Sequence, residues 1–138
     1  HHKTKKKLPK AVAILNPHQI DCQYPFKGLC GAGVAFKLCI ALNNSLGYDL
    51  ENILQYSDLV AIATTADVMP VVDENRFIVK EGLKRIINGN NKGIKSLINV
   101  SKLDSNSLTV GKLSYWFMLS IFYSRKKNGS TIYKFNSW

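Results

Sequence analysis

The sequence predicts an α/β fold, rich in helix and with one short strand that would join a parallel sheet. The apolar run Ala11–Leu15 ends at Asn16-Pro17, which is typical of a buried strand followed by a turn. Later segments instead repeat apolar residues every three or four positions, the spacing of helices. A length of 138 residues with 46% hydrophobic content suits one domain with a real core.

The next stretch, "NPHQIDCQYPFKG", is predicted to be a loop, because Pro17 and Pro25 lack the amide donors that regular structure uses. A helix should follow from about Ala32 to Leu46, where Val34, Leu38, Ala41 and Leu42 recur at helical spacing. Gly47 is expected to end this helix.

Three further helices are expected. The first runs from Glu51 to Ala63, with Asp49 as its cap. Its inward-facing residues would be Ile53, Leu54, Leu59 and Val60. After the break at "TTADVMPV", a helix opens at Asp73 or Glu74 and continues to about Ile87, with Phe77, Ile78, Leu83, Ile86 and Ile87 as its apolar residues. The turn cluster "NGNNKG" precedes a short helix at about Lys92 to Val100.

The net charge of +10 is concentrated at the two ends of the chain. Residues 11–111 contain nine acidic and nine basic side chains, so the middle is neutral. The basic ends are interpreted either as solvated or as nucleic-acid contacts. No apolar run approaches the roughly 20 residues of a membrane helix. The three cysteines lack metal-type spacing, which favours reduced thiols over zinc or disulfides.

Two segments have the residue types of a functional site, each with a structural alternative. Asp67 is one carboxylate in the uncharged stretch "AIATTADVMP", where it would either cap a helix or turn, or bind a metal at an element end. Gly28, Gly31 and Gly33 precede a helix, where amides can hold phosphate or glycines can allow close packing. The fingerprint G-x-G-x-x-G is incomplete, because Phe36 occupies its third glycine position.

Three segments together resemble a known family. They are the initial "HH", then "YPFKGLCGAGVAFK", then "ADVMPVVDENR". In this order and spacing they resemble the RecJ-like branch of the DHH phosphoesterase superfamily, from His1 to about Gly111. The resemblance implies the C-terminal part of a DHH-type Rossmann-like domain. His1-His2 is then the end of an Asp-His-His motif; an affinity tag would more often leave a longer histidine run.

The same resemblance implies the chemistry of the site. His1 and Asp67 would be ligands of Mn²⁺ or Mg²⁺, and we expect them to approach each other at one edge of the structure. His2 would be the catalytic residue beside the metals, contacting the scissile phosphate or transferring a proton. The implied activity is hydrolysis of single-stranded DNA from an end, in DNA repair and recombination.

The chain is expected to be a fragment, residues 1–111 being a partial DHH domain and residues 112–138 an atypical basic and aromatic tail. A frameshifted or prematurely ended reading frame would explain this tail, as would a divergent native element. Because the aspartates upstream of the motif are missing, the fragment alone is expected to be inactive.

The expected partner is single-stranded DNA and the expected location the cytoplasm, with no membrane association. Lys5, Lys6 and Lys7 are candidate nucleic-acid contacts. One alternative is another DHH phosphoesterase, acting on oligoribonucleotides or cyclic dinucleotides. A second is a non-catalytic fragment whose lysine run and Arg125–Lys127 cluster bind nucleic-acid backbone.

Overall fold

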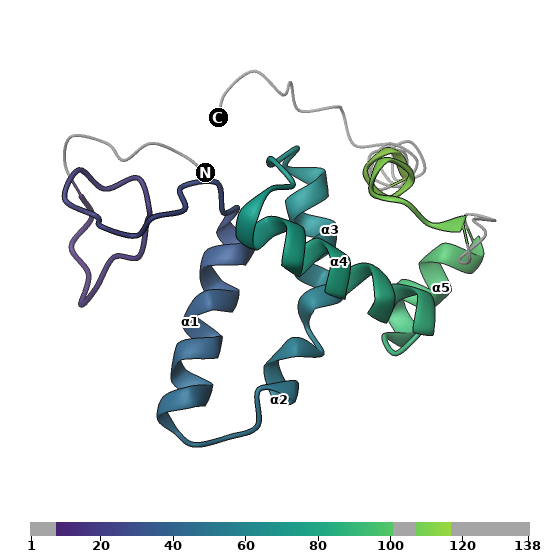
Figure 1. Ribbon diagram of the computed structural model, residues 1–138, viewed down its shortest axis with the longest axis horizontal. Helices are drawn as coiled ribbons and strands as arrows, with labels where there is room; N and C mark the ends of the chain where they lie inside the picture. The colour runs from purple at the N-terminus through teal and green to yellow at the C-terminus, as the bar shows by residue number, and fades with distance from the viewer. Residues whose placement is uncertain (1–7, 101–106, 117–138) are drawn as a thin grey trace.

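The computed structural model describes residues 8–100 and 107–116, and all regular structure in these ranges is helical (Figure 1). The helices are α1 (Gly31–Ser45), α2 (Glu51–Leu54), α3 (Ser57–Ala66), α4 (Asp73–Asn88) and α5 (Lys92–Val100), and residues 110–116 are also helical. The predicted α/β class, with its parallel-sheet strand of a Rossmann-like domain, is therefore wrong for the described residues.

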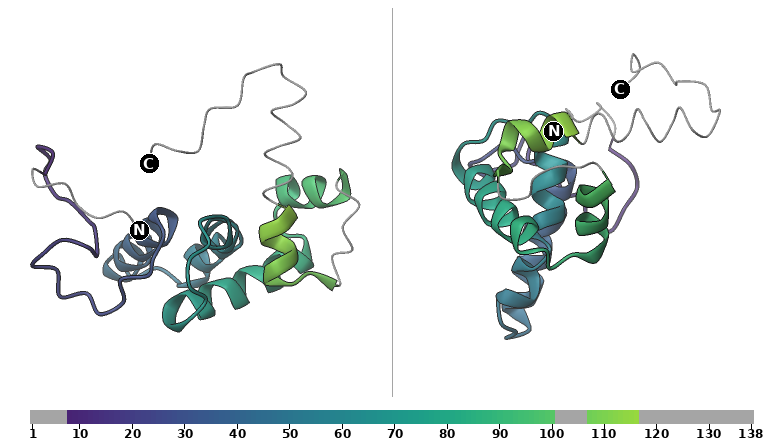
Figure 2. Two further views of the ribbon diagram at one scale, coloured as in Figure 1. Left: turned by 90° about the horizontal axis from the view of Figure 1, so that it is seen from above. Right: turned by 90° about the vertical axis from the view of Figure 1, so that its right-hand side faces the viewer.

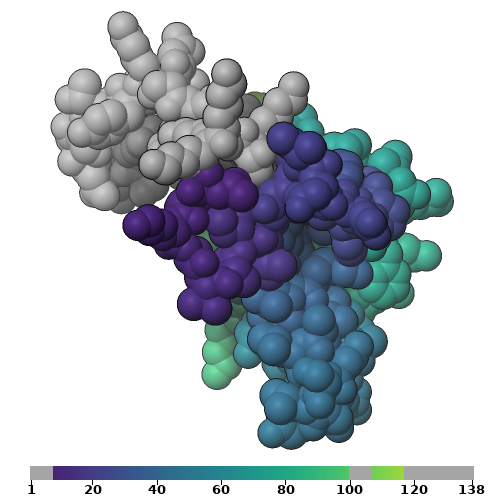
Figure 3. Space-filling model, turned by 90° about the vertical axis from the view of Figure 1, so that its left-hand side faces the viewer, coloured from purple at the N-terminus to yellow at the C-terminus, as the bar shows by residue number. Residues whose placement is uncertain are grey.

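The segment predicted to be a strand, residues 11–15, is irregular and lies at the surface beside α1 (Figure 3). Val12 and Leu15 are exposed, and Ile14 is half-buried. A strand persists only when its amides and carbonyls pair with a neighbouring strand, and the described residues contain none. The strand predicted at 11–15 is therefore wrong, because an apolar run forms a strand only where a neighbouring strand pairs with it.

The helices predicted at 32–46, 73–87 and 92–100 are confirmed as α1, α4 and α5. The helix predicted at 51–63 is instead two helices, α2 and α3, separated by a turn at residues 55–56. Asp49 accepts the amide of Glu51 at 2.9 Å, but the N-cap of α2 is Leu50, so the predicted cap lies one residue too early. Leu59, expected to face inward, is 49% exposed, because after the break α3 turns its small residues toward α4.

The contact between α3 and α4 is the most extensive among the described helices, and the two lie side by side in every view (Figures 1 and 2). Gly82 makes this possible, since a Cβ on it would overlap the Ser57 carbonyl oxygen and the Ala61 side chain. Farther along α4, Arg85 forms an ion pair with Glu51 at 2.8 Å and so ties α4 to α2. These contacts fix the N-terminal half of α3 against α4.

Two apolar clusters form the core. One joins α1, α3 and α4 around Leu29, Phe36, Val60 and Ile78. The other joins α3, α4, α5 and the 110–116 helix around Ile62, Ile86, Ile94, Ile98, Leu108, Leu113 and Trp116. The domain boundary after Gly111 stays a prediction, and residues 117–138 lie outside the described ranges. Among the helices described here, none combines the length and apolarity needed to cross a bilayer.

Candidate functional site

One end of the helical body gathers segments that are far apart in the sequence. The N-termini of α1 and α4 and the C-terminus of α3 lie there together (Figures 1 and 2). Cys30 is buried at the start of α1, and its Sγ lies 3.6 Å from Thr64 Oγ1 on α3. We call this region the motif end and define it as residues 24–30 and 67–75.

Asn75 joins the two halves of the motif end. Its side chain is fully buried, and Nδ2 donates to the Gly28 carbonyl at 2.7 Å and to the Pro70 carbonyl at 2.9 Å. The two chain segments approach closely, since a Cβ on Gly28 would lie 3.3 Å from the Pro70 ring and 2.7 Å from Phe26. The segments "YPFKGLCGAGVAFK" and "ADVMPVVDENR" are therefore packed together through backbone and side chain alike.

A polar cluster lies on the outer side of this junction. The Tyr24 hydroxyl donates to both carboxylate oxygens of Glu74, at 2.6 and 2.7 Å. Lys37 Nζ lies 3.4 Å from the same carboxylate and 5.9 Å from the centre of the Tyr24 ring. The three side chains come from the loop before α1, from α1 and from the first turn of α4, so the cluster links three parts of the fold.

The cluster shifts the ionisation of two of its members. Burial raises the pKa of Tyr24, and its hydrogen bond to Glu74 raises it further. Burial by itself would lower the pKa of Lys37, but the contacts with Tyr24 and the charge of Glu74 outweigh this and raise it. At neutral pH the hydroxyl therefore stays protonated and the amine charged, which is the state that the observed contacts require.

Asp67 lies at the C-terminal end of α3, where its backbone amide donates to the Ala63 carbonyl at 2.9 Å. It is exposed and cannot act as the N-cap of a helix from this position. A carboxylate at a helix C-terminus is disfavoured by the helix dipole. The residue that follows, Val68, has a φ of +53°, which a β-branched residue rarely adopts. The acid therefore stands on a locally unfavourable turn.

The glycine-rich loop has a structural use in the observed fold. Cys30 is the N-cap of α1, and its Sγ accepts the amide of Gly33 at 3.3 Å. Gly33 is buried, and a Cβ there would lie 3.2 Å from the Leu29 side chain. These contacts favour the close-packing interpretation of the glycines over phosphate binding.

The remaining predicted site residues, His1, His2, Lys5, Lys6 and Lys7, lie outside the described residues. The expected approach of His1 to Asp67 therefore stays a prediction. Within residues 8–100 and 107–116, no group of three or more histidine, cysteine, aspartate or glutamate side chains could hold a metal ion. The Asp67 carboxylate is the kind of oxygen donor that Mn²⁺ and Mg²⁺ prefer, and its role as a ligand stays a prediction.

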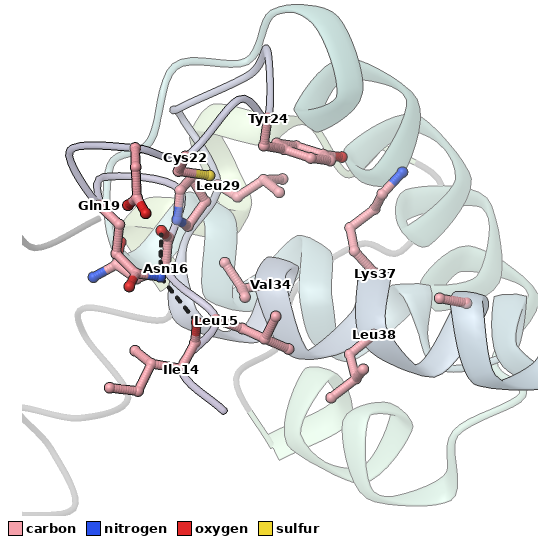
Figure 4. Close-up of a pocket in the computed structure, with 13 residues that line it drawn as sticks. Ile14, Leu15, Asn16, Gln19, Cys22, Tyr24, Leu29, Val34, Lys37 and Leu38 are labelled. Carbon is pink, nitrogen blue, oxygen red and sulfur yellow. Dashed lines mark hydrogen bonds between the residues drawn. The ribbon is translucent and has the colours of Figure 1, made fainter. Parts of the chain in front are cut away.

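A cavity of about 540 Å³ opens between the 14–24 loop and α1 (Figure 4). Its walls are mostly apolar, and Tyr24 and Lys37 stand on one side with their polar ends directed toward each other. Asp67 is not among the residues that line it. Asp67 is therefore outside the cavity wall, and the motif end contributes Tyr24 and Leu29 to that wall.

Residue-by-residue reasoning from the sequence missed Tyr24, Lys37, Glu74 and Asn75. All four lie inside the segments that carried the family resemblance, so their presence there was the available signal. Their roles depend on contacts across 37 to 50 residues of sequence, which no local pattern reveals.

Comparison with known proteins gives a consistent result. The chain is 46% identical over 114 residues to the single-stranded-DNA-specific exonuclease RecJ of Bacillus subtilis, covering 80% of this chain and 14% of that protein. It is 38% identical over 125 residues to RecJ of Escherichia coli, covering 83% of this chain and 22% of that protein. Over 56 residues it is 55% identical to RecJ of Thermus thermophilus, covering 41% and 8%.

No protein-family model matches the chain, and no solved structure does. The chain spans less than a quarter of the length of the RecJ proteins just described. The matches to the Bacillus and Escherichia proteins nevertheless cover four fifths of it or more. The resemblance drawn from the motif segments is thus confirmed, and over most of its length this chain is a RecJ-like sequence that corresponds to one segment of those exonucleases.

Proposed function

We propose that the chain is part of the catalytic domain of a metal-dependent exonuclease that hydrolyses phosphodiester bonds in single-stranded DNA. The similarity to RecJ proteins over four fifths of the chain carries this proposal. The packing of the two motif segments into one end of the fold supports it. In this proposal residues 1–111 belong to the DHH domain and residues 112–138 are an atypical tail, whose beginning packs on the core through Leu113 and Trp116. The protein would work in the cytoplasm in DNA repair and recombination.

The proposal gives Asp67 the role of a metal ligand. Its support is the position of the carboxylate, exposed at the C-terminus of α3, beside Val68 with its φ of +53° and inside a segment with the family resemblance. His1 would be a second ligand and His2 the group that contacts the scissile phosphate. Bound Mn²⁺ or Mg²⁺ would activate water and neutralise charge in the transition state.

Two other functions remain as alternatives. Another DHH phosphoesterase, acting on oligoribonucleotides or cyclic dinucleotides, would use the same ligands. A non-catalytic nucleic-acid-binding fragment would use only basic side chains. The names of the relatives favour single-stranded DNA over the first. The similarity to exonucleases over four fifths of the chain favours catalysis over the second.

The test is Asp67→Asn in the full-length protein that contains this segment. Losing a metal ligand should lower the cleavage rate by at least about 100-fold, because activation of water depends on the metal. Affinity for single-stranded DNA should hold or increase, since one negative charge is removed. Asp49→Asn, at an exposed acid just before α2, is the matched control and should cleave normally. Near-normal cleavage by the Asp67 variant would exclude the ligand role.

The lysine run gives a second, opposite signature. If Lys5, Lys6 and Lys7 contact phosphates, replacing all three by alanine should weaken binding of single strands. The slope of log affinity against log salt should also become shallower, by about 0.7 for each phosphate that is no longer neutralised. The cleavage rate at saturating DNA should be retained. An unchanged salt slope would remove these residues from the DNA path.

A further inference from the structure

The turn that carries Asp67 is held from both of its ends, by backbone bonds to α3 and by side chains at the start of α4. Residues 67–72 join α3 to α4. Two non-glycine residues with positive φ lie here: Val68 within the turn, and Asp73, the first residue of α4. Such backbone costs about 1–3 kcal/mol per residue and persists only when the surroundings enforce it. On the α3 side the amides of Val68 and Met69 donate to the carbonyls of Thr65 and Thr64, at 3.2 and 3.0 Å. On the α4 side the contacts are those of Glu74 and Asn75.

We propose that Asn75 and the Tyr24–Glu74–Lys37 cluster are positioning residues that lock the 67–72 turn against the 24–30 loop and so orient the Asp67 carboxylate toward its metal. This inference rests on the proposed function of Asp67. None of the four residues is placed at the metal or the substrate. Each acts through the turn that Asp67 begins.

Asn75 is the inner half of the lock. Because the Asn75 amide group donates to carbonyls on both segments, at 2.7 and 2.9 Å, Pro70 cannot shift relative to Gly28 without stretching or breaking one of these two bonds. The side chain is fully buried, so no water replaces a lost bond at low cost. The inner half therefore fixes the position of the turn relative to the loop.

The Tyr24–Glu74–Lys37 cluster is the outer half. Two short hydrogen bonds from one hydroxyl to a carboxylate fix Glu74 relative to the loop before α1. Lys37 approaches the same carboxylate from α1 at 3.4 Å and offsets its charge. Glu74 and Asn75 are adjacent on α4. Both halves of the lock therefore hold the first turn of this helix against the loop before α1.

The opposite end of the molecule supplies a matched control. Asn43 is also a buried asparagine, and its Nδ2 also donates to two backbone carbonyls, of Tyr48 at 2.9 Å and of Asp49 at 3.1 Å. It lies near the C-terminus of α1, about 20 Å along that helix from the motif end by the helical rise. Asn43→Ala thus removes the same chemistry from a place without a proposed metal ligand.

The experiment uses the full-length protein, with Mn²⁺ as the probe. Mn²⁺ affinity is measured in the absence of DNA by the electron paramagnetic resonance signal of the free ion, beside the thermal midpoint and the cleavage rate. Asn75→Ala should weaken Mn²⁺ binding by about tenfold, the usual cost of losing an outer-shell support. Its cleavage rate at saturating Mn²⁺ should be retained. Asn43→Ala should lower the thermal midpoint comparably without altering Mn²⁺ affinity.

The outcomes separate the lock from the function on which it rests. If Asp67→Asn weakens Mn²⁺ binding and Asn75→Ala lowers only the thermal midpoint, the lock is excluded while the proposed function stands. If Asp67→Asn leaves Mn²⁺ affinity unchanged, the proposed ligand role fails, and the lock fails with it. Should Asn75→Ala not fold, Tyr24→Phe, which removes only the outer hydroxyl, must still weaken Mn²⁺ binding, and unchanged affinity there overturns the proposal.

Discussion

The two ends of the helical body each contain a chain reversal, and the two reversals are held by different contacts. At the motif end, and at the opposite end formed by residues 43–51, which we call the turn end, a buried asparagine holds a chain reversal by two hydrogen bonds. At the turn end both acceptors lie within six residues of Asn43, and the positive φ falls on Gly47. At the motif end one acceptor lies 47 residues from Asn75, and the positive φ falls on Val68.

The two turns differ in how well their residues suit the backbone conformation that each adopts. Glycine adopts positive φ without penalty, so the turn end needs only local contacts. A valine in the same region is strained, and an acid at the adjacent helix C-terminus adds an unfavourable charge. Departures from local preference that long-range contacts maintain are expected at functional sites. The motif end has such a departure at Val68, whereas the turn end has a glycine at its position of positive φ.

The largest effect on stability should come from the contact between α3 and α4. Gly82→Val would place side-chain atoms into the Ser57 carbonyl and the Ala61 side chain, so α3 and α4 must separate. We expect the free energy of unfolding to fall by about 3 kcal/mol, as in overpacked cores. Urea unfolding measures the loss. Gly111→Val, at a helical position with no atom within 4 Å, is the control and should cost little.

A smaller effect should distinguish the two turns by its sign. Gly47→Ala forces a side chain into positive φ and should destabilise the protein by about 1 kcal/mol. Val68→Gly relieves about 1–2 kcal/mol of strain, of which the greater freedom of glycine in the unfolded chain takes back about 1 kcal/mol. It should therefore leave stability unchanged or raise it. Thermal midpoints of both variants test this, and a clear loss for Val68→Gly would mean that the turn is not strained.

The same contrast explains what could be predicted from the sequence. The helices α1, α4 and α5 were predictable because their apolar period is a local property. The break within the predicted 51–63 helix was not predictable from local pattern. It lies beside the close contact of Ser57 with Gly82, which belongs to a later helix. The strand at 11–15 failed for a related reason, since strands depend on a partner.

The residues of the candidate site also differ in whether local sequence could reveal them. Asp67 stood out because it is a lone charge in an apolar context and falls in a segment with a family resemblance. Asn75 and Glu74 did not stand out, because an asparagine and a glutamate at the start of a helix are ordinary by local rules. Their bonds to Gly28 and Tyr24, across 47 and 50 residues, become visible only in the folded chain.

The smallest effect concerns the outer half of the lock and its pH dependence. Tyr24→Phe removes the hydroxyl that donates to Glu74 and keeps the ring. The bond is charge-assisted but partly exposed, so we expect a loss of about 1 kcal/mol at neutral pH. Tyr48→Phe at the turn end, where the side chain is 62% exposed, is the control and should leave the pH profile of stability as it is in the unmodified protein.

The sign of the pH effect follows from the pKa of Tyr24, which folding raises above its ordinary value of 10.0 through burial and the bond to Glu74. A group with a raised pKa stabilises the fold fully below its unfolded pKa, and this stability is lost as the pH rises through the folded pKa. Lys37, whose pKa is also raised, loses its contribution in the same alkaline range. Above about pH 10 the stability of the unmodified protein should therefore fall toward that of Tyr24→Phe. Urea midpoints that stay equally far apart from pH 7 to pH 11 would show that this hydroxyl does not hold Glu74.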